Sequence, residues 1–177
     1  MKITISGTPG TGKTEISKKL SERLGWKLIS VNDLAEQLKA YSGEDKKRKV
    51  KILDMKKIKT YFEKIKENVI IEGHASHEIS CDIAIVLRCN PEVLEKRLKE
   101  KYPTNLDKIK ENFDAEILGV ITSEAVEFNK KVYEIDTSEK GIEQNVDDVL
   151  NIIDGRTIEY EVGRIDWLEK YEDRLLK

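Results

Sequence analysis

The chain reads Gly7-Thr8-Pro9-Gly10-Thr11-Gly12-Lys13-Thr14 directly after the apolar run Ile3-Thr4-Ile5-Ser6. This stretch fills the pattern G-x-x-x-x-G-K-[ST], and a helical pattern follows it from Lys13 to Leu24. The glycines let several backbone N–H groups point at one anion, and the positive end of the helix adds to the attraction. The order of strand, glycine-rich turn and helix therefore predicts a loop that binds the phosphates of a nucleoside triphosphate.

Lys13 and Thr14 are the side chains of this loop with expected chemical roles. A lysine at this position reaches the β- and γ-phosphates, and the hydroxyl that follows it coordinates Mg²⁺. The backbone around Gly10 and Gly12 is expected to contact the phosphates. The alternative is an ordinary glycine-rich turn, which the strand before the motif and the helix after it disfavour. We expect ATP and Mg²⁺ as the ligands.

The composition fits one domain of 177 residues. Charged residues make up 37% of the chain, but the net charge of −2 argues against general binding to nucleic acid. One basic cluster stands out, residues 46–49 with Lys51. Cys81 and Cys89 form no metal or disulfide framework, and we find no signal peptide or apolar membrane span. We therefore expect a cytoplasmic protein with no membrane partner.

Strands and helices alternate along most of the chain. Strands are expected at residues 3–6, 27–31, 69–72, 83–88 and 132–135. Helices are expected at residues 13–24, 33–41, 55–66, 91–101, 106–129 and 142–153, with Asn32, Asp54 and Asn90 as N-caps. This alternation predicts a three-layer α/β fold with a five-stranded parallel sheet, and ligands in such sheets bind beyond the carboxyl ends of the strands.

Three stretches depart from the alternation. Residues 42–50 are polar and charged, and residues 102–105 contain Pro103, so both are expected to be mobile flaps. The tail, residues 154–177, ends in an apolar stripe at helical spacing. The stripe comprises Trp167, Leu168, Tyr171, Leu175 and Leu176, and it predicts a short helix over residues 166–176.

The next candidate site is Val69-Ile70-Ile71-Glu72-Gly73-His74. A carboxylate at the end of a buried strand is suited to hold Mg²⁺ or to orient a water molecule. His74 lies on the same face as Glu72 if the extended geometry continues, and there it would position a water or contact the γ-phosphate. The alternatives are a solvated strand-terminal glutamate and a surface histidine.

Other candidates lie at the ends of the remaining strands. Asn32 and Asp33 follow the second strand, where a second substrate would lie, although they also suit a helix start. Arg88 ends the fourth strand and Arg97 is on the next helix; either can stabilise a transferring phosphoryl group or form a structural ion pair. Thr137, within residues 136–138, follows the fifth strand and is a candidate to hold the adenine base.

The order and spacing of these motifs resemble the adenylate kinase isoenzyme 6 family, most of all its archaeal branch. The resemblance rests on TPGTGKT, the segments 31–35 and 52–54, IIEGH, IVLRCNPEVLEKRL and the 136–138 loop, and it covers residues 2–153. It implies a P-loop kinase domain over residues 1–153, with an NMP-binding flap at 30–53 and a short lid at 100–110. The tail, residues 154–177, lies outside it.

The same resemblance implies functional roles. Glu72 and His74 stand for the family's Asp-x-His pair, with Glu72 and Thr14 on the metal and His74 in ATP hydrolysis. Lys101 replaces the lid arginine as a cation near the transferred phosphoryl group, and Glu15 occupies a nucleotide-site position that is commonly Thr. Glu36 stands where an arginine often clamps the acceptor phosphate, so lysines of the flap would have to substitute for it.

Three functions follow as hypotheses. The first is an NMP kinase that catalyses ATP + AMP ⇌ 2 ADP, accepts other NMPs and has ATPase activity. The resemblance also implies a role in small ribosomal subunit (16S rRNA) maturation, with reversible binding of ribosomal protein uS11 and the pre-ribosome. The second is an ATPase assembly factor with little kinase activity. The third is a small-metabolite P-loop kinase of the shikimate or gluconate type.

Overall fold

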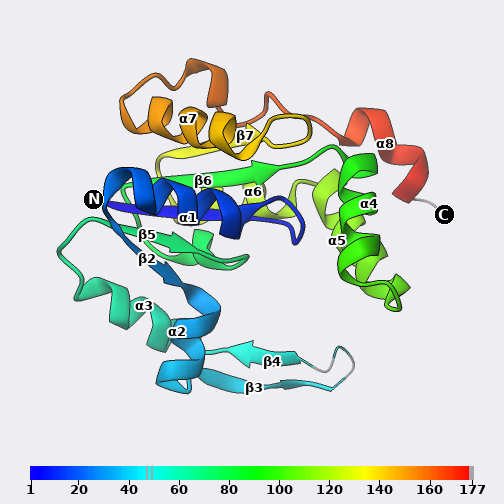
Figure 1. Cartoon of the computed structure of the whole chain (residues 1–177). Coiled ribbons are helices and arrows are strands. Elements are labelled where there is room, and N and C mark those ends of the chain that lie inside the picture. Colours follow the sequence, from blue (N-terminus) through cyan, green and yellow to red (C-terminus); the bar gives the residue numbers. More distant parts are fainter. Residues whose placement is uncertain (47, 49, 176–177) are drawn as a thin grey trace.

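A parallel sheet of five strands forms the centre of the molecule (Figure 1). The computed structural model describes residues 1–46, 48 and 50–175. The strands are ordered β2-β5-β1-β6-β7, and each pairs in parallel with its neighbours. Their bounds are β1 Lys2–Gly7, β2 Lys27–Ser30, β5 Val69–Glu72, β6 Ile83–Arg88 and β7 Val132–Asp136. The predicted five-stranded parallel sheet is confirmed, and each expected strand agrees to within one residue at either end.

The register brings the carboxyl ends of the central strands to one edge of the sheet. Ile5 of β1 pairs with Glu72 of β5, and Gly7 of β1 pairs with Leu87 of β6. β1 therefore delivers the glycine-rich loop between the ends of its two neighbours. This is the edge at which ligands bind in parallel α/β sheets.

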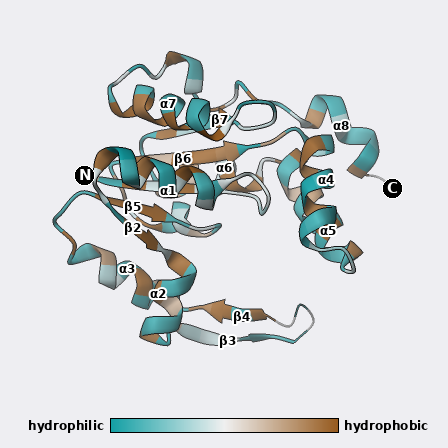
Figure 2. Cartoon of the chain, viewed as in Figure 1, coloured by the Kyte–Doolittle hydropathy of each residue, from teal (hydrophilic) through white to brown (hydrophobic). Residues whose placement is uncertain are grey.

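Helices cover both faces of the sheet and give the three predicted layers. On one face, α1 (Lys13–Leu24) and α7 (Ile142–Ile153) pack over Ile3, Ile5 and Ile85. On the other, α2 (Val31–Leu38) and α3 (Met55–Glu63) pack against β2 and β5, and α6 (Val120–Phe128) packs behind β6 and β7. Figure 2 shows the apolar strands between helices whose outer surfaces are hydrophilic. Burial of these strands drives the layering.

Two helices, α4 (Pro91–Lys101) and α5 (Leu106–Ile117), stand at the carboxyl edge of the sheet. The single helix expected over residues 106–129 is wrong, because Gly119 takes a left-handed conformation (φ 61°) and separates α5 from α6. The expected N-cap Asn32 is also wrong, since Ser30 caps α2 through its hydroxyl. Asp54 and Asn90 cap α3 and α4 as predicted.

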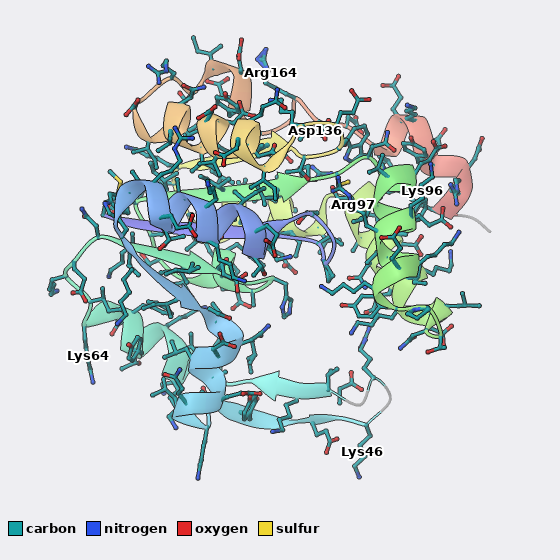
Figure 3. The ribbon with its side chains drawn as sticks, viewed as in Figure 1. Lys46, Lys64, Lys96, Arg97, Asp136 and Arg164 are labelled. Carbon is teal, nitrogen blue, oxygen red and sulfur yellow. The ribbon has the colours of Figure 1, made fainter. Side chains whose placement is uncertain are left out.

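The segment expected to be a mobile flap forms the turn and most of an antiparallel hairpin, which the sequence did not predict. Lys39 ends α2 in a left-handed conformation (φ 49°), and the chain then forms β3 (Tyr41–Asp45) and β4 (Val50–Leu53). Lys46 lies at the free end of the hairpin (Figure 3), whereas Lys47 and Lys49 of the basic cluster lie outside the described residues. The hairpin projects away from the sheet, below α5 in the view of Figure 1.

The tail returns to the carboxyl edge of the sheet. After α7 the chain forms the short 3₁₀ helix η2 (Ile158–Tyr160), and the tail ends in α8 (Leu168–Leu175). Tyr171 of α8 packs on Phe113 and Ile117 of α5, with Trp167 at the border of this cluster. Leu176 of the expected stripe lies outside the described residues. Across residues 1–46, 48 and 50–175, no helix is long and apolar enough to cross a bilayer.

Candidate nucleotide site

The glycine-rich loop has a backbone that only its sequence pattern allows. Gly7 takes φ 139°, and a Cβ at this position would lie 2.4 Å from the carbonyl oxygen of Leu87. Gly12, at the start of α1, takes a left-handed conformation (φ 91°). Side chains are strained at both positions, and at Gly7 there is also no room for one. The loop therefore passes tightly from β1 to α1, with its amides at the positive end of that helix.

Buried threonine hydroxyls hold this loop through hydrogen bonds, both within the loop and to segments that pack against it. The Thr11 hydroxyl donates to the Thr8 carbonyl (2.9 Å), and the Thr137 hydroxyl donates to the carbonyls of Thr11 and Arg88 (3.0 Å each). The Thr8 hydroxyl donates to Glu116 of α5 (2.6 Å). Because its hydroxyl is used within the protein, Thr137 supports the loop, and the adenine contact expected of it stays a prediction.

The Lys13 ammonium lies inside the loop. Its Nζ donates to the carbonyls of Gly7 (2.8 Å) and Thr8 (3.0 Å). Burial is the main cause that lowers its pKa to about 8; the Glu72 carboxylate opposes this, the Lys101 ammonium adds to it, and Glu116 opposes it. Glu72 and Lys101 therefore both lie close enough to Lys13 to act on its charge.

Glu72 and Thr14 bring two side-chain oxygens close together next to Lys13. Glu72 is buried at the end of β5, and its carboxylate lies 3.5 Å from the Thr14 hydroxyl. Among the described residues, no group of three or more His, Cys, Asp and Glu side chains is placed to hold a metal ion. The pair fits Mg²⁺, which prefers oxygen ligands and takes most of them from phosphates and water in kinase sites.

His74 reaches the site by a turn rather than by an extended strand. β5 ends at Glu72, and Gly73 (φ 152°) starts a turn in which the Ser76 amide donates to the Gly73 carbonyl (3.2 Å). The same-face argument for His74 is therefore wrong. Although solvent reaches the His74 side chain, desolvation and then the Lys13 ammonium lower the pKa of its imidazole below its ordinary value. His74 thus lies near Lys13 and favours its neutral form.

Arg97 of α4 joins the glycine-rich loop to the loop after β7. Its guanidinium donates to the carbonyls of Thr137 (3.0 Å), Ser138 (3.3 Å) and Gly10 (3.4 Å). Figure 3 shows Arg97 on the helix that faces the end of β7, where Asp136 lies. The partners of the guanidinium are carbonyl oxygens, so these contacts do not support the structural ion pair expected as one alternative. The other alternative, stabilisation of a transferring phosphoryl group, stays a prediction.

Arg88 is placed in the core instead of at a substrate site. Arg88 is 4% exposed, and its guanidinium donates to Glu116 (2.8 Å) and forms an ion pair with Glu134. It also contacts Thr122 and the backbone carbonyl of Glu116. These contacts support the structural ion pair that the sequence left open, and they do not support the predicted substrate contact.

The acceptor side is more open than the loop. Asn32 and Asp33 are exposed in the first turn of α2, with Glu36 and Lys39 exposed further along the same segment. Glu15 is likewise exposed in the first turn of α1. At the hairpin, Arg48 forms ion pairs with Asp45 (3.0 Å) and with Glu111 of α5 (2.6 Å). The carboxylates that Arg48 contacts compete with any phosphate at this position.

Glu116 is the residue of this region that sequence reasoning missed. Its carboxylate is 2% exposed and contacts the glycine-rich loop, Arg88 and the Cys89 amide (3.0 Å). Its partners lie 27 to 108 residues away along the chain. The only local signal was a charged residue one position before the buried Ile117, which does not distinguish Glu116 from the many exposed glutamates.

Comparison with known proteins places this site in a family. The chain is 40% identical to "Putative adenylate kinase" of Methanocaldococcus jannaschii, over 99% of this chain and 97% of that protein. It is 42% identical to the protein of the same name from Archaeoglobus fulgidus, over 99% of this chain and 96% of that protein. The chain belongs to this archaeal family. The resemblance predicted from its motifs is confirmed, but its expected limit at residue 153 is wrong, because these matches extend into the tail, residues 154–177. A family model described as "AAA domain" also matches residues 3–119.

Solved structures of other kinases share the fold. Shikimate kinase from Acinetobacter baumannii superimposes with a TM-score of 0.62 at 15% identity, over 89% of this chain and 94% of that one. Deoxyadenosine kinase from M. mycoides gives a TM-score of 0.55 at 19% identity, over 89% of this chain and 100% of that one. At such identities the likeness shows the α/β fold alone, and family membership comes from the archaeal relatives.

Proposed function

We propose that this protein is a nucleoside monophosphate kinase that transfers the γ-phosphoryl group of ATP to AMP or another NMP, with ATPase activity in addition. The observation that carries the proposal is the convergence of Lys13, Thr14, Glu72 and His74 at the carboxyl ends of β1 and β5. Lys101, at the end of α4, adds a second cation near Lys13. Its relatives carry the name of an adenylate kinase.

Phosphoryl transfer asks a protein mainly to position groups and to stabilise charge. Lys13 would exchange its two carbonyl partners for the β- and γ-phosphates, while the loop amides hold the rest of the triphosphate. Thr14 and Glu72 would hold Mg²⁺, which when bound neutralises phosphate charge. Lys101 would stabilise the charge on the transferred group, and Asn32 and Asp33 would contact the acceptor nucleotide.

The lowered pKa of His74 supports a role in hydrolysis. A neutral imidazole accepts a hydrogen bond from water, whereas a protonated one does not. Near Lys13, a neutral His74 would position the attacking water when no acceptor is bound. On this proposal, the kinase and ATPase activities share one site and differ in the acceptor, which is an NMP in the first and water in the second.

The test is ADP formation from MgATP with and without AMP, with the other NMPs, shikimate and gluconate as alternative acceptors. A kinase forms ADP faster when AMP is present, and a small-metabolite kinase responds to shikimate or gluconate instead. ADP formation that no acceptor accelerates would contradict the kinase proposal. The Lys13→Ala protein, purified in parallel, controls for contaminating kinases.

A second candidate is an ATPase assembly factor with little kinase activity. The open acceptor side favours it, since Glu36 replaces the usual clamp and Arg48 is paired with carboxylates. On this proposal, nucleotide-dependent binding of ribosomal protein uS11 and the pre-ribosome is the output. A pull-down with uS11 in the presence of ATP, ADP or no nucleotide tests it, and a complex that forms equally in all three would count against it.

A further inference from the structure

The buried Glu116 carboxylate connects three parts of the molecule, and its two oxygens have different partners. One oxygen accepts from Arg88 (2.8 Å) and from the Cys89 amide (3.0 Å), at the end of β6. The other accepts from the Thr8 hydroxyl (2.6 Å) in the glycine-rich loop. Neutralising Arg88 requires only the first oxygen, so the contact with Thr8 needs a separate explanation.

Thr8 is the point at which the loop is held. Its carbonyl accepts hydrogen bonds from the Lys13 ammonium (3.0 Å), the Thr11 hydroxyl (2.9 Å) and the Thr11 amide (3.2 Å). Its side chain is 2% exposed and points into the protein at Glu116, so the hydroxyl does not face a ligand. A contact that holds Thr8 in place therefore also sets the orientation of the loop and the position of the Lys13 ammonium.

We propose that Glu116 is a positioning residue for the glycine-rich loop, and that it acts through its hydrogen bond with the Thr8 hydroxyl. A hydrogen bond to a buried carboxylate is stronger than a neutral one, because the acceptor is charged and screened from water. The bond keeps the loop in its binding conformation before nucleotide arrives, so the entropy cost of ordering the loop does not reduce the affinity for ATP. The effect that we infer on turnover rests on the proposed kinase function. The effect that we infer on ATP affinity does not depend on it.

The location of Glu116 gives the bond a second consequence. Glu116 lies in α5, which follows directly on residues 102–105, the turn within the predicted lid. A shift of α5 along its axis would pull on Thr8 and on the end of β6 together. Glu116 therefore couples the loop to the lid segment, in addition to the contact of Arg97 with Gly10.

The test compares two matched deletions of a buried hydroxyl. Thr8→Val removes the donor to Glu116 and leaves the Arg88 ion pairs intact. Thr122→Val removes a hydroxyl from the same ion cluster, where it donates to Glu134 (2.7 Å), without touching the loop. Thr8→Ser keeps the hydroxyl and is the conservative rescue. The measurements are the Kd of ATP by calorimetry, kcat and KM for ATP, and the melting temperature.

The expected result is a Kd for ATP about tenfold higher in Thr8→Val, and values within about twofold of wild type in Thr122→Val and Thr8→Ser. kcat/KM for ATP should fall in proportion. A purely structural role would lower the melting temperatures of both valine variants and leave ATP affinity unchanged. Equal Kd values in wild type, Thr8→Val and Thr122→Val would overturn the inference, and so would a Thr8→Ser protein as weak as Thr8→Val.

Glu116→Gln supplies a double-mutant comparison. If Glu116 acts through Thr8, Thr8→Val raises the Kd of ATP less in the Glu116→Gln protein than in wild type, because the amide is only a neutral partner for the Thr8 hydroxyl. Independent losses that multiply would contradict the inference. A wild-type protein that binds ATP but shows no acceptor-dependent ADP formation would refute the proposed kinase activity, and the Kd comparison would still decide the role of Glu116.

Discussion

The glycine-rich loop and the β3–β4 hairpin would border the same proposed site, but the protein holds them in opposite ways. Buried hydrogen bonds fix the loop through Thr8, Thr11 and Thr137, which join it to α5 and β6. The hairpin is largely exposed, and its outer end contacts the body through Arg48 and Glu111. Buried contacts resist change, whereas exposed ion pairs contribute little because water screens them.

This difference implies that ATP would bind to a rigid, preformed surface, whereas the acceptor would bind to an exposed and weakly held one. The triphosphate would enter a preformed cradle, so that binding orders little of the protein. The acceptor would meet a surface whose cations are solvated or already paired, and closure would have to complete its site. Mutations on the loop side should therefore change activity strongly, and mutations in the hairpin should change it weakly.

The largest effect is expected from Lys13→Ala on the loop side. Without the ammonium, the transferred charge loses its main protein contact, and turnover should fall by about a thousandfold or more. The Thr8 carbonyl keeps its bonds from Thr11, so the melting temperature should stay within about 4 °C of wild type. ADP formation and thermal unfolding measure the two quantities. Lys18→Ala, an exposed lysine of the same helix, is the control and should match wild type.

His74→Ala should separate hydrolysis from binding. Loss of the water-positioning imidazole is expected to reduce ATP hydrolysis without acceptor by about a hundredfold, with the Kd of ATP changed by about threefold or less. Single-turnover hydrolysis and calorimetry check this. Equal losses in hydrolysis and affinity would show instead that His74 is a binding residue.

The lowered pKa of Lys13 predicts that ATP affinity falls with rising pH, whereas the contribution of this residue to the free energy of unfolding rises. Since its pKa is lowered to about 8, the free protein loses the ammonium as the pH rises through 8, and ATP affinity should decline above that pH. Between pH 8 and 10.5 the unfolded chain binds more protons than the native one at this residue, so the contribution of Lys13 to the free energy of unfolding rises with pH. Calorimetric Kd values and urea midpoints over pH 7–10 measure the two slopes. An ATP affinity that does not change across this range would contradict the lowered pKa.

Arg48→Ala in the hairpin should have the smallest effect. Removing an exposed ion pair is expected to leave the melting temperature unchanged within error and to alter KM for the acceptor by about twofold. Lys46→Ala, at the free end of the same hairpin, is the control. A tenfold rise in the acceptor KM in Arg48→Ala alone would reverse the comparison, because it would make the hairpin a specific phosphate contact.

The sequence predicted the sheet and the loop because their signals are local. Each buried strand is a short apolar run, and the loop carries its conformation in Gly7 and Gly12. Lys13, Thr14 and Glu72 follow from the same signals, since the topology brings the ends of β1 and β5 together.

What could not be predicted depends on contacts between distant segments or on single backbone angles. The ion cluster of Arg88, Glu116 and Glu134 forms only when β6, α5 and β7 have packed, so the sequence alone does not decide between the two roles expected for Arg88. The apolar residues Val50 and Ile52 of the hairpin are exposed, so burial in a core does not mark its strands. His74 was misplaced because Gly73 turns the chain out of the sheet.

The docking of α8 on α5 gives the protein an optical reporter of its own. The chain has two tryptophans, Trp26 against the core beside α1 and Trp167 at the border of the α5–α8 contact. With Trp26 replaced by Phe, the tryptophan fluorescence of the protein would come from Trp167 alone, which packs beside Phe113 and Tyr171. Any displacement of α5 that accompanies nucleotide binding would then change the emission of Trp167, and rapid mixing would time that displacement without an attached dye.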